Sequence, residues 1–207
     1  MGDGYVADMC STSSVPAPPK ITSLLTLQEL RRVQLDIRNT TRPTWHEGPP
    51  SNFGEKGHGK LKSDQWRSCI EFDLPVSLTS LLREARAENR LADASRLGKV
   101  LKSTMLLATA IQWATSHRTS AFHVERYTNY IHQYLESIRT LRPCLDLHPN
   151  HHNALHLQEF FLSFGPMHGW WMYPFERVNG ILQSTPINFK LGNHAFLIIF
   201  LFTHAKL

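Results

Sequence analysis

Apolar side chains recur at every third or fourth position over most of the chain, which is the spacing of one face of an α-helix. The alternation of apolar and polar residues that marks a half-buried strand is absent from the sequence. We therefore expect a mainly α fold, an irregular helical domain with about six to seven helices. The expected helices cover about 27–38, 63–70, one long helix or two from 73 to about 117, 120–141, 151–164, and a last helix from 174.

Local signals indicate where several of these helices begin. Thr26 and Glu29 have the spacing of a capping box, in which each side chain accepts from the backbone N–H of the other residue. Asp73, in the sequence Asp-Leu-Pro, is typical of a helix start, because aspartate caps well and proline suits an early helical position. Thr119 or Ser120 can cap the helix that ends near 141.

One apolar stripe is unusually regular. Its members are separated by three or four residues, a period near that of tightly packed helix pairs. They are Val124, Tyr127, Ile131, Tyr134, Ile138 and Leu141. The ordinary interpretation of such a stripe is core packing, and the alternative is a face that binds a partner helix.

The chain divides by composition into three parts. Residues 1–21 are rich in serine and proline and are expected to be a disordered leader. Residues 22–190 form the helical domain, within which 39–60 is a connection rich in proline and glycine. Residues 191–207 form an apolar tail. Its most hydrophobic segment, 195–202, is far shorter than the about 20 residues of a membrane-spanning helix. A membrane partner is therefore not expected.

Charge and cysteine content narrow the class of protein only slightly. The 207 residues carry a net charge of +5 with a pI of about 9.3, which favours polyanionic partners mildly and serves solubility equally well. The three cysteines are far apart and have no zinc or disulfide spacing. Since the start of the chain also lacks a signal-peptide pattern, we expect a nuclear or cytoplasmic protein that is not secreted.

Three stretches carry a more specific signal. The first is His58-Gly-Lys-Leu-Lys-Ser-Asp-Gln-Trp-Arg67, followed by Asp73-Leu-Pro-Val76. The second is His148-Pro-Asn-His-His-Asn-Ala-Leu-His156, and the third is Phe164-Gly-Pro-Met-His-Gly-Trp170 with Pro174-Phe-Glu-Arg-Val-Asn-Gly180. In this order and at these intervals they resemble the region after the catalytic core of fungal CACTA-superfamily (En/Spm-like) DNA transposases. The third stretch also resembles the plant relatives.

The resemblance implies a fragment of a cut-and-paste transposase, which has an RNase H-like core with a helical insertion. Such a core holds two divalent metal ions on two aspartates and a glutamate. One ion activates the nucleophile and the other stabilises the leaving oxygen. Mg²⁺ is thus the cofactor implied for the parent family, while no cofactor is expected on this chain alone.

Glu176, in Pro-Phe-Glu-Arg, is the candidate for the late glutamate that the resemblance implies. Its alternative interpretation is a solvent-facing helix residue paired with Arg177. We expect the two family aspartates to lie upstream of this chain, because its own aspartates fall in helical or loop contexts and match neither. They are Asp36, Asp64, Asp73, Asp93 and Asp146. Glu176 is therefore expected to be inactive by itself. After Lys190 the sequence departs from the family pattern.

Basic and aromatic residues near these stretches are candidates for nucleic-acid contact. Lys56, Lys60, Lys62 and Arg67 follow a glycine-rich approach to a predicted helix, and Arg177 lies beside Glu176. A solvated surface is an equal alternative for these cations. Near the end, aromatic side chains can stack on bases or fill the core, and core is favoured for the first and last of them: Trp170, Trp171 and Tyr173.

His152 and His156 lie one helical turn apart and form the weaker alternative of a zinc site. Glu159, Cys144 and His148 are nearby in sequence, but no second pair with ligand spacing completes the set. Polar packing is the favoured interpretation.

Three hypotheses of function therefore stand: a transposase-derived fragment without independent catalysis, a helical interaction module, and a helical zinc protein. The expected partners are DNA and a second copy of the chain, with no small-molecule substrate.

Overall fold

The computed structural model describes residues 24–179, except positions 45, 56, 58, 59, 144, 173, 174, 176 and 177. Within that part the chain is mainly helical and has no strand, so the predicted fold class is confirmed at that level. The elements are α1 (Leu27–Asn39), α2 (Ser63–Ser68), the π-helical turn η1 (Cys69–Asp73), α3 (Leu74–Ala87), α4 (Leu91–Ala114), α5 (Ala121–Leu141), α6 (Pro149–Phe164) and the 3₁₀ turn η2 (Met167–Gly169).

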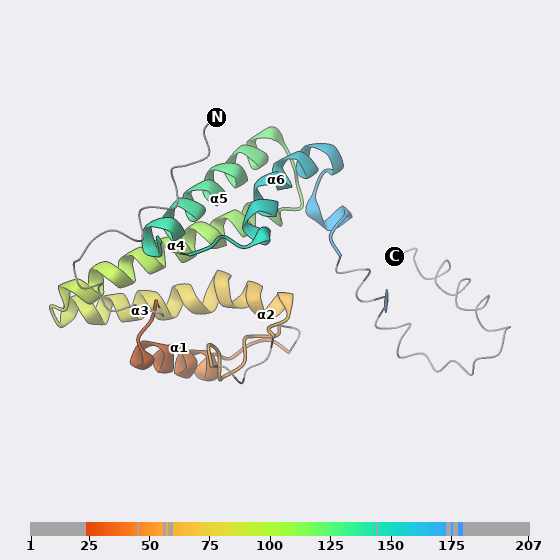
Figure 1. Ribbon diagram of the computed structural model, residues 1–207. Helices are drawn as coiled ribbons and strands as arrows, with labels where there is room; N and C mark the ends of the chain where they lie inside the picture. The colour runs from red at the N-terminus through yellow and green to blue at the C-terminus, as the bar shows by residue number, and fades with distance from the viewer. Residues whose placement is uncertain are drawn as a thin grey trace, which may run out of the picture. The chain divides into compact units, whose positions relative to one another are not determined.

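Two compact units divide the chain, one of residues 1–167 and one of residues 168–207. The first contains all six α-helices of the described residues. Within it α3 packs on α4, α4 on α5 and α5 on α6, while α1 packs on α3 and η1. As Figure 1 shows, α1 lies along the α2–α3 helix, while α4, α5 and α6 lie side by side beyond it.

The helix count differs from the prediction, because α2, η1 and α3 form one continuous helix. The described residues therefore hold five separate helical segments rather than six to seven. Asp73 was predicted to start a new helix, which is wrong: its backbone is helical, at φ −63° and ψ −52°, and its side chain makes no cap hydrogen bond. The predicted helix from Pro174 falls largely outside the described residues.

The π-helical turn has a physical reason in Pro75. Proline has no N–H to donate to the carbonyl four residues earlier, and its ring crowds that carbonyl in a regular α-helix. One turn before the proline the hydrogen bonding widens, and the N–H of Leu74 reaches the carbonyl of Cys69, five residues back. The helix continues through the proline instead of ending there.

Between α3 and α4 the chain turns at Glu88–Arg90. Asn89 has φ +56°, in the left-handed region that asparagine tolerates better than most residues. The N–H of Arg90 donates to the carbonyl of Ala85 at 2.9 Å and closes the end of α3. Of the two alternatives for 73–117, the pair of helices is therefore the correct one.

The helix starts predicted at Thr26 and at Thr119 or Ser120 are confirmed, whereas the helix expected from 151 begins earlier, at Pro149. Thr26 N donates to Glu29 Oε2 at 2.7 Å, and Glu29 N donates to Thr26 Oγ1 at 3.3 Å, which is the capping box before α1. Ser120, and not Thr119, caps α5 by accepting from the N–H of His123. At the far end of α6, Gly165 has φ +75°, where a side chain would strain the backbone.

The main core joins α1, α3 and α4. Its buried residues are Val33, Ile37, Leu78, Leu81, Leu82, Ala85, Leu97 and Val100. Arg96 fastens α4 to the start of α1, because its guanidinium donates to Glu29 Oε1 at 2.5 Å and to the carbonyl of Leu24 at 2.8 Å. Burial raises the pKa of Glu29, but the hydrogen bonds from Arg96 and Thr26 outweigh it and lower that pKa overall.

A second layer of core holds α5 between α4 and α6. The stripe on α5 is buried at Val124, Tyr127 and Ile131, so its prediction as core packing is confirmed there, and Leu135, outside the predicted stripe, is buried as well. The hydroxyl of Tyr127 donates to the carbonyl of Ala154 at 2.8 Å, and its ring meets Phe161 edge-on with centroids 5.2 Å apart. The rest of the stripe (Tyr134, Ile138 and Leu141) is only half-buried.

None of the helices in the described residues is long and apolar enough to cross a membrane. The apolar run 195–202 lies outside that part of the chain.

Leu97→Ala and Leu91→Ala compare two leucines of the same helix, one 1% and one 76% exposed. Removing the buried side chain leaves a cavity and should lower the free energy of unfolding by about 2–5 kcal/mol. The exposed leucine should change it by less than about 0.5 kcal/mol. Urea denaturation followed by circular dichroism measures both. Equal losses would mean that α4 does not pack on α3 through Leu97.

Candidate functional site

A buried polar cluster holds the 40–50 loop against the α2–α3 helix. Arg42 pairs with the Asp73 carboxylate, and its Nη1 donates to Ser68 Oγ at 3.0 Å. Ser68 in turn donates to Asp73 Oδ2 at 3.2 Å. The side chains of Asp73 and Arg42 are only 1% and 14% exposed, so the ion pair is shielded from water. The π-helical turn supplies Asp73, and the residue before that turn is Ser68.

His46 completes the cluster with an arrangement that superficially suggests nucleophilic catalysis. Its Nε2 lies 3.0 Å from Ser68 Oγ. The single hydrogen of Ser68 is directed to Asp73, so this oxygen accepts from both Arg42 and His46. His46 is then a donor, the reverse of a base that removes a serine proton. Ser68 is also only 2% exposed, which closes it to a substrate. The cluster therefore has a structural role, which is to hold the loop against the α2–α3 helix.

Cys69 lies directly beside this cluster and is completely buried. Burial, assisted by the Asp73 carboxylate, raises the pKa of its thiol to about 12. At neutral pH the group is therefore an uncharged thiol, which is a poor nucleophile and a poor metal ligand. Cys10 and Cys144 lie outside the described residues.

The predicted nucleic-acid cluster is only partly described, because Lys56 and Arg177 lie outside the described residues. Lys60 is exposed. Lys62 Nζ lies 3.4 Å from Glu47 Oε2, and Arg67 Nε lies 3.2 Å from Glu71 Oε1. A depression of about 420 Å³ beside them is lined by His46, Glu47, Asp64, Arg67 and Glu71. Three carboxylates thus accompany the three described cations, and this surface is not a net basic patch.

A second group of cations lies where the end of α5 packs beside α4. Ser137 Oγ donates to Ser103 Oγ at 2.8 Å, which sets α4 and α5 antiparallel in register. The last turn of α5 therefore lies beside the turn of α4 that precedes Ser103. Four basic residues fall at this end, and none forms an ion pair within the described residues: Lys99, Lys102, Arg139 and Arg142. We call these four the α4–α5 basic end.

Sequence reasoning missed this group. In the sequence, Lys99 and Lys102 follow a stretch in which acidic and basic residues are interleaved, which by itself indicates only a solvated helix face. Asp93, the acid on the same helix, forms ion pairs with two other residues: its carboxylate lies 3.0 Å from Arg90 and 3.2 Å from Arg96. The packing of α4 on α5 places the four cations at the same end of the helix pair, and no local sequence signal encodes that packing.

His152 and His156 do meet on the exposed face of α6. Their Nε2 atoms are 3.2 Å apart, and Glu159 Oε1 lies 3.8 Å from His156 Nδ1, on the other side of that ring. Two nitrogen ligands about 2.1 Å from a tetrahedral zinc ion would have a similar separation. Within the described residues, however, no group of three histidine, cysteine or carboxylate side chains gathers as a metal site would require. The zinc site stays a prediction, since Cys144 is not described.

The second unit contributes few described residues to any site. Glu176, Tyr173 and Pro174 lie outside them. Trp170 and Trp171 are half-buried, and the Trp171 ring lies against His168 with centroids 4.1 Å apart. The choice between base stacking and core for these tryptophans stays open.

Comparison with known proteins adds no relative: no family model, no curated protein and no solved structure matches this chain.

Arg42→Ala tests whether the polar cluster is a structural fastening. It leaves the Asp73 carboxylate buried without its cation and should lower the free energy of unfolding by about 3–5 kcal/mol. Lys62→Ala is the matched control, because it removes an exposed ion pair and should cost less than about 1 kcal/mol. Urea denaturation at neutral pH measures both variants. If Arg42→Ala were as mild as the control, the cluster would not hold the loop.

Proposed function

We propose that this chain is a helical piece of a CACTA-superfamily cut-and-paste DNA transposase, which contacts DNA but does not carry out metal-dependent strand cleavage alone. The observation that carries the proposal is the order and spacing of the three sequence stretches at 58–76, 148–156 and 164–180. The mainly helical architecture agrees with a helical insertion of an RNase H-like core. A nuclear or cytoplasmic location follows from the same proposal.

The first stretch has a clear structural role in this chain. Its Asp-Leu-Pro segment supplies both the proline that forces the π-helical turn and the carboxylate that holds Arg42. The second stretch forms the N-terminal half of α6, which is fastened to α5 through the carbonyl of Ala154. Both stretches thus include residues on which the helical packing depends.

Catalysis in the parent enzyme would require Glu176 to share two Mg²⁺ ions with two further carboxylates. Two hard cations beside a phosphodiester need several anionic oxygen ligands, because one carboxylate leaves most of their charge unmatched. In this proposal the aspartates come from sequence outside this chain, and Glu176 is a ligand only when they are present.

DNA contact would rest on the α4–α5 basic end rather than on the predicted cluster. Phosphate binding gains affinity from cations that are free to release counterions from the DNA. Lys62 and Arg67 already face Glu47 and Glu71, whereas Lys99 and Arg139 have no carboxylate partner among the described residues. Contacts of this kind are independent of sequence and weaken steeply with salt.

Reversing the charge of Lys99 and Arg139 together should weaken binding of a fluorescein-labelled DNA duplex about tenfold. The salt slope of log Kd should fall by about 0.9 for each lost phosphate contact. The control Lys62→Glu with Arg67→Glu changes the net charge equally and should have less than about twofold effect, because these cations are already paired. Fluorescence anisotropy between 50 and 200 mM salt, roughly the range of strongest response, measures this. A larger loss of DNA affinity in the control would mean that the DNA contacts the predicted cluster and not the α4–α5 basic end.

Incubation of the same samples with Mg²⁺ tests the proposal that this chain alone does not cleave DNA. The duplex, made with terminal inverted repeats, should stay intact. Nicking by the purified chain that disappears in Glu176→Gln would overturn this part of the proposal.

A second candidate function is self-association through α6. The sequence hypothesis placed a partner on the α5 stripe, but half of that stripe is buried inside the fold. Three exposed apolar side chains lie close together in sequence at the end of α6, where Phe160, Leu162 and Phe164 are 44%, 66% and 64% exposed. The rings of Phe160 and Phe164 stack with centroids 6.0 Å apart and form a continuous apolar surface.

Sedimentation velocity tests this second candidate over a range of protein concentrations. The unaltered chain should associate, while Phe160→Glu with Phe164→Glu should stay monomeric, because charged side chains cannot be buried against a second copy. Leu91→Glu is the control at an exposed leucine distant in sequence from this surface and should associate normally. A monomeric unaltered chain at the highest concentration would contradict the idea.

A further inference from the structure

A half-open cavity of about 250 Å³ lies between α4 and α5 and extends to η1 and to the loop that follows α5. Seven of its twelve lining residues are aliphatic, among them Ile70 of the π-helical turn, Leu107 of α4 and Ile138 of α5. A smaller apolar cavity, of about 150 Å³, is known to hold a benzene ring. We call this cavity the α4–α5 groove.

The groove has polar groups at its edge, and most of them are already engaged. The Thr104 hydroxyl donates to the carbonyl of Val100 at 3.0 Å, and the Ser103 hydroxyl accepts from Ser137 at 2.8 Å. Three lining groups remain: the guanidinium of Arg142, the hydroxyl of Tyr134 and one ring nitrogen of His151. The Arg142 guanidinium and the Tyr134 hydroxyl have no hydrogen-bond or ion-pair partner within the described residues.

Each of the three remaining groups is a donor. An arginine side chain donates only. Burial raises the pKa of Tyr134, which keeps its hydroxyl protonated at neutral pH. His151 Nδ1 accepts from the backbone N–H of His148 at 3.0 Å, so in the neutral ring the proton is on Nε2. Three donors thus border an apolar space.

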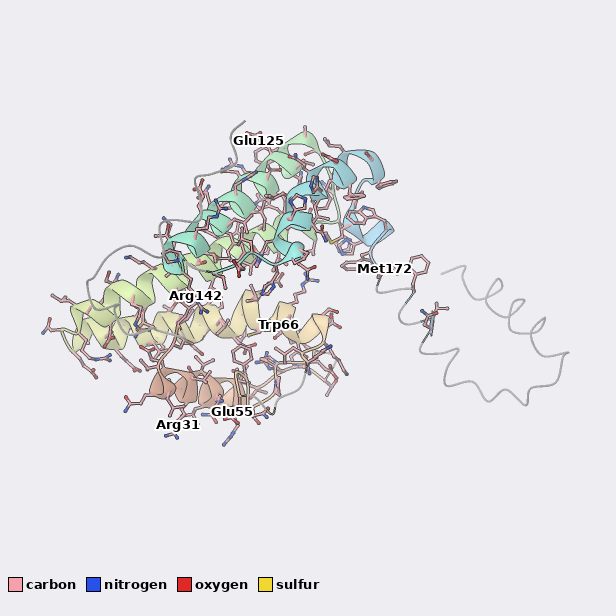
Figure 2. The ribbon with its side chains drawn as sticks, in the orientation of Figure 1. Arg31, Glu55, Trp66, Glu125, Arg142 and Met172 are labelled. Carbon is pink, nitrogen blue, oxygen red and sulfur yellow. The ribbon has the colours of Figure 1, made fainter. Side chains whose placement is uncertain are left out.

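The described lining of the groove also carries no negative charge, because none of these twelve residues is an aspartate or glutamate. As Figure 2 shows, Arg142 lies at the end of α5, on the side that faces the α2–α3 helix, which contributes Ile70 to the groove. A half-buried guanidinium beside apolar walls attracts a planar anion more strongly than an exposed one does.

We propose that the α4–α5 groove binds a small organic carboxylate with an apolar body of about six to eight carbons, a chain or a single ring. The apolar body lies against the aliphatic walls. The carboxylate accepts from Arg142 in a two-bond contact, with Tyr134 and His151 as further donors. This goes beyond the DNA contact and departs from the expectation that the chain has no small-molecule ligand.

Isothermal titration of the full chain with sodium octanoate tests the proposal, with 1-octanol as the uncharged probe of the same length. Octanoate should bind at least about tenfold more tightly than octanol, because a charge-assisted pair stabilises only the former. Arg142→Gln should abolish that difference and leave octanol unchanged. Tyr134→Phe, which keeps the shape of the ring, should weaken octanoate a few-fold.

The matched control is Arg139→Gln, which removes an exposed cation from the same helix end without altering the lining of the groove. It should bind octanoate as the unaltered chain does, and circular dichroism should give all variants the same melting temperature. The proposal is overturned if octanoate gives no saturable heat, if octanol binds equally well, or if Arg139→Gln weakens octanoate as much as Arg142→Gln does. Failure of this proposal is distinguishable from failure of the DNA proposal, because the Lys99 and Arg139 variants that test DNA contact leave the lining of the groove unaltered.

Discussion

The widened turn before Pro75 is the constraint on which the first half of the molecule depends. A proline inside a helix must either end it or displace the hydrogen bonding around it. Here the hydrogen bonding is displaced, and the helix continues without a break from Ser63 to Ala87. Because a π-turn adds a residue to one turn of helix, it rotates the side chains before it relative to those after it. Asp73 and Ser68 thereby both reach Arg42, while Ile70 reaches the space beside α4.

The second half is organised around α4, which packs on α3 with one face and on α5 with another. A helix with two packed faces cannot have a single apolar stripe, and small residues mark where its neighbours approach closely. Ser103, Ala108, Ala110 and Ala114 are all buried. The hydroxyl pair of Ser103 and Ser137 sets the register, and from that register come both the α4–α5 basic end and the α4–α5 groove.

Local signals predicted what depends on local chemistry. The capping box at Thr26, the start of α5 and the core role of its stripe all rest on spacing within one helix, so the sequence contains them. The prediction that a helix starts at Asp73 was wrong, because the Asp73 carboxylate pairs with Arg42, 31 residues away in the sequence, instead of capping the backbone. The ion pair of Lys62 was also invisible, since its partner Glu47 comes from another segment and lies beside it only after folding. Arg67 differs, because its partner Glu71 is one helical turn away and the sequence contains that pair. Asp73 and Lys62 thus both depend on tertiary contacts that no local signal contains.

The same reasoning explains why the candidate sites differ in kind. The Arg42–Asp73 cluster is rich in reactive residue types, yet each of its polar groups is satisfied by another, which leaves nothing for a ligand. The α4–α5 groove is poorer in such residues, but its donors lack acceptors in the described part of the chain. A folded chain tolerates unmatched donors beside an apolar wall only at a cost in free energy, unless water or a ligand satisfies them. Unmatched donors, and not the mere presence of serine, histidine and aspartate together, are therefore the better guide to where this protein binds something.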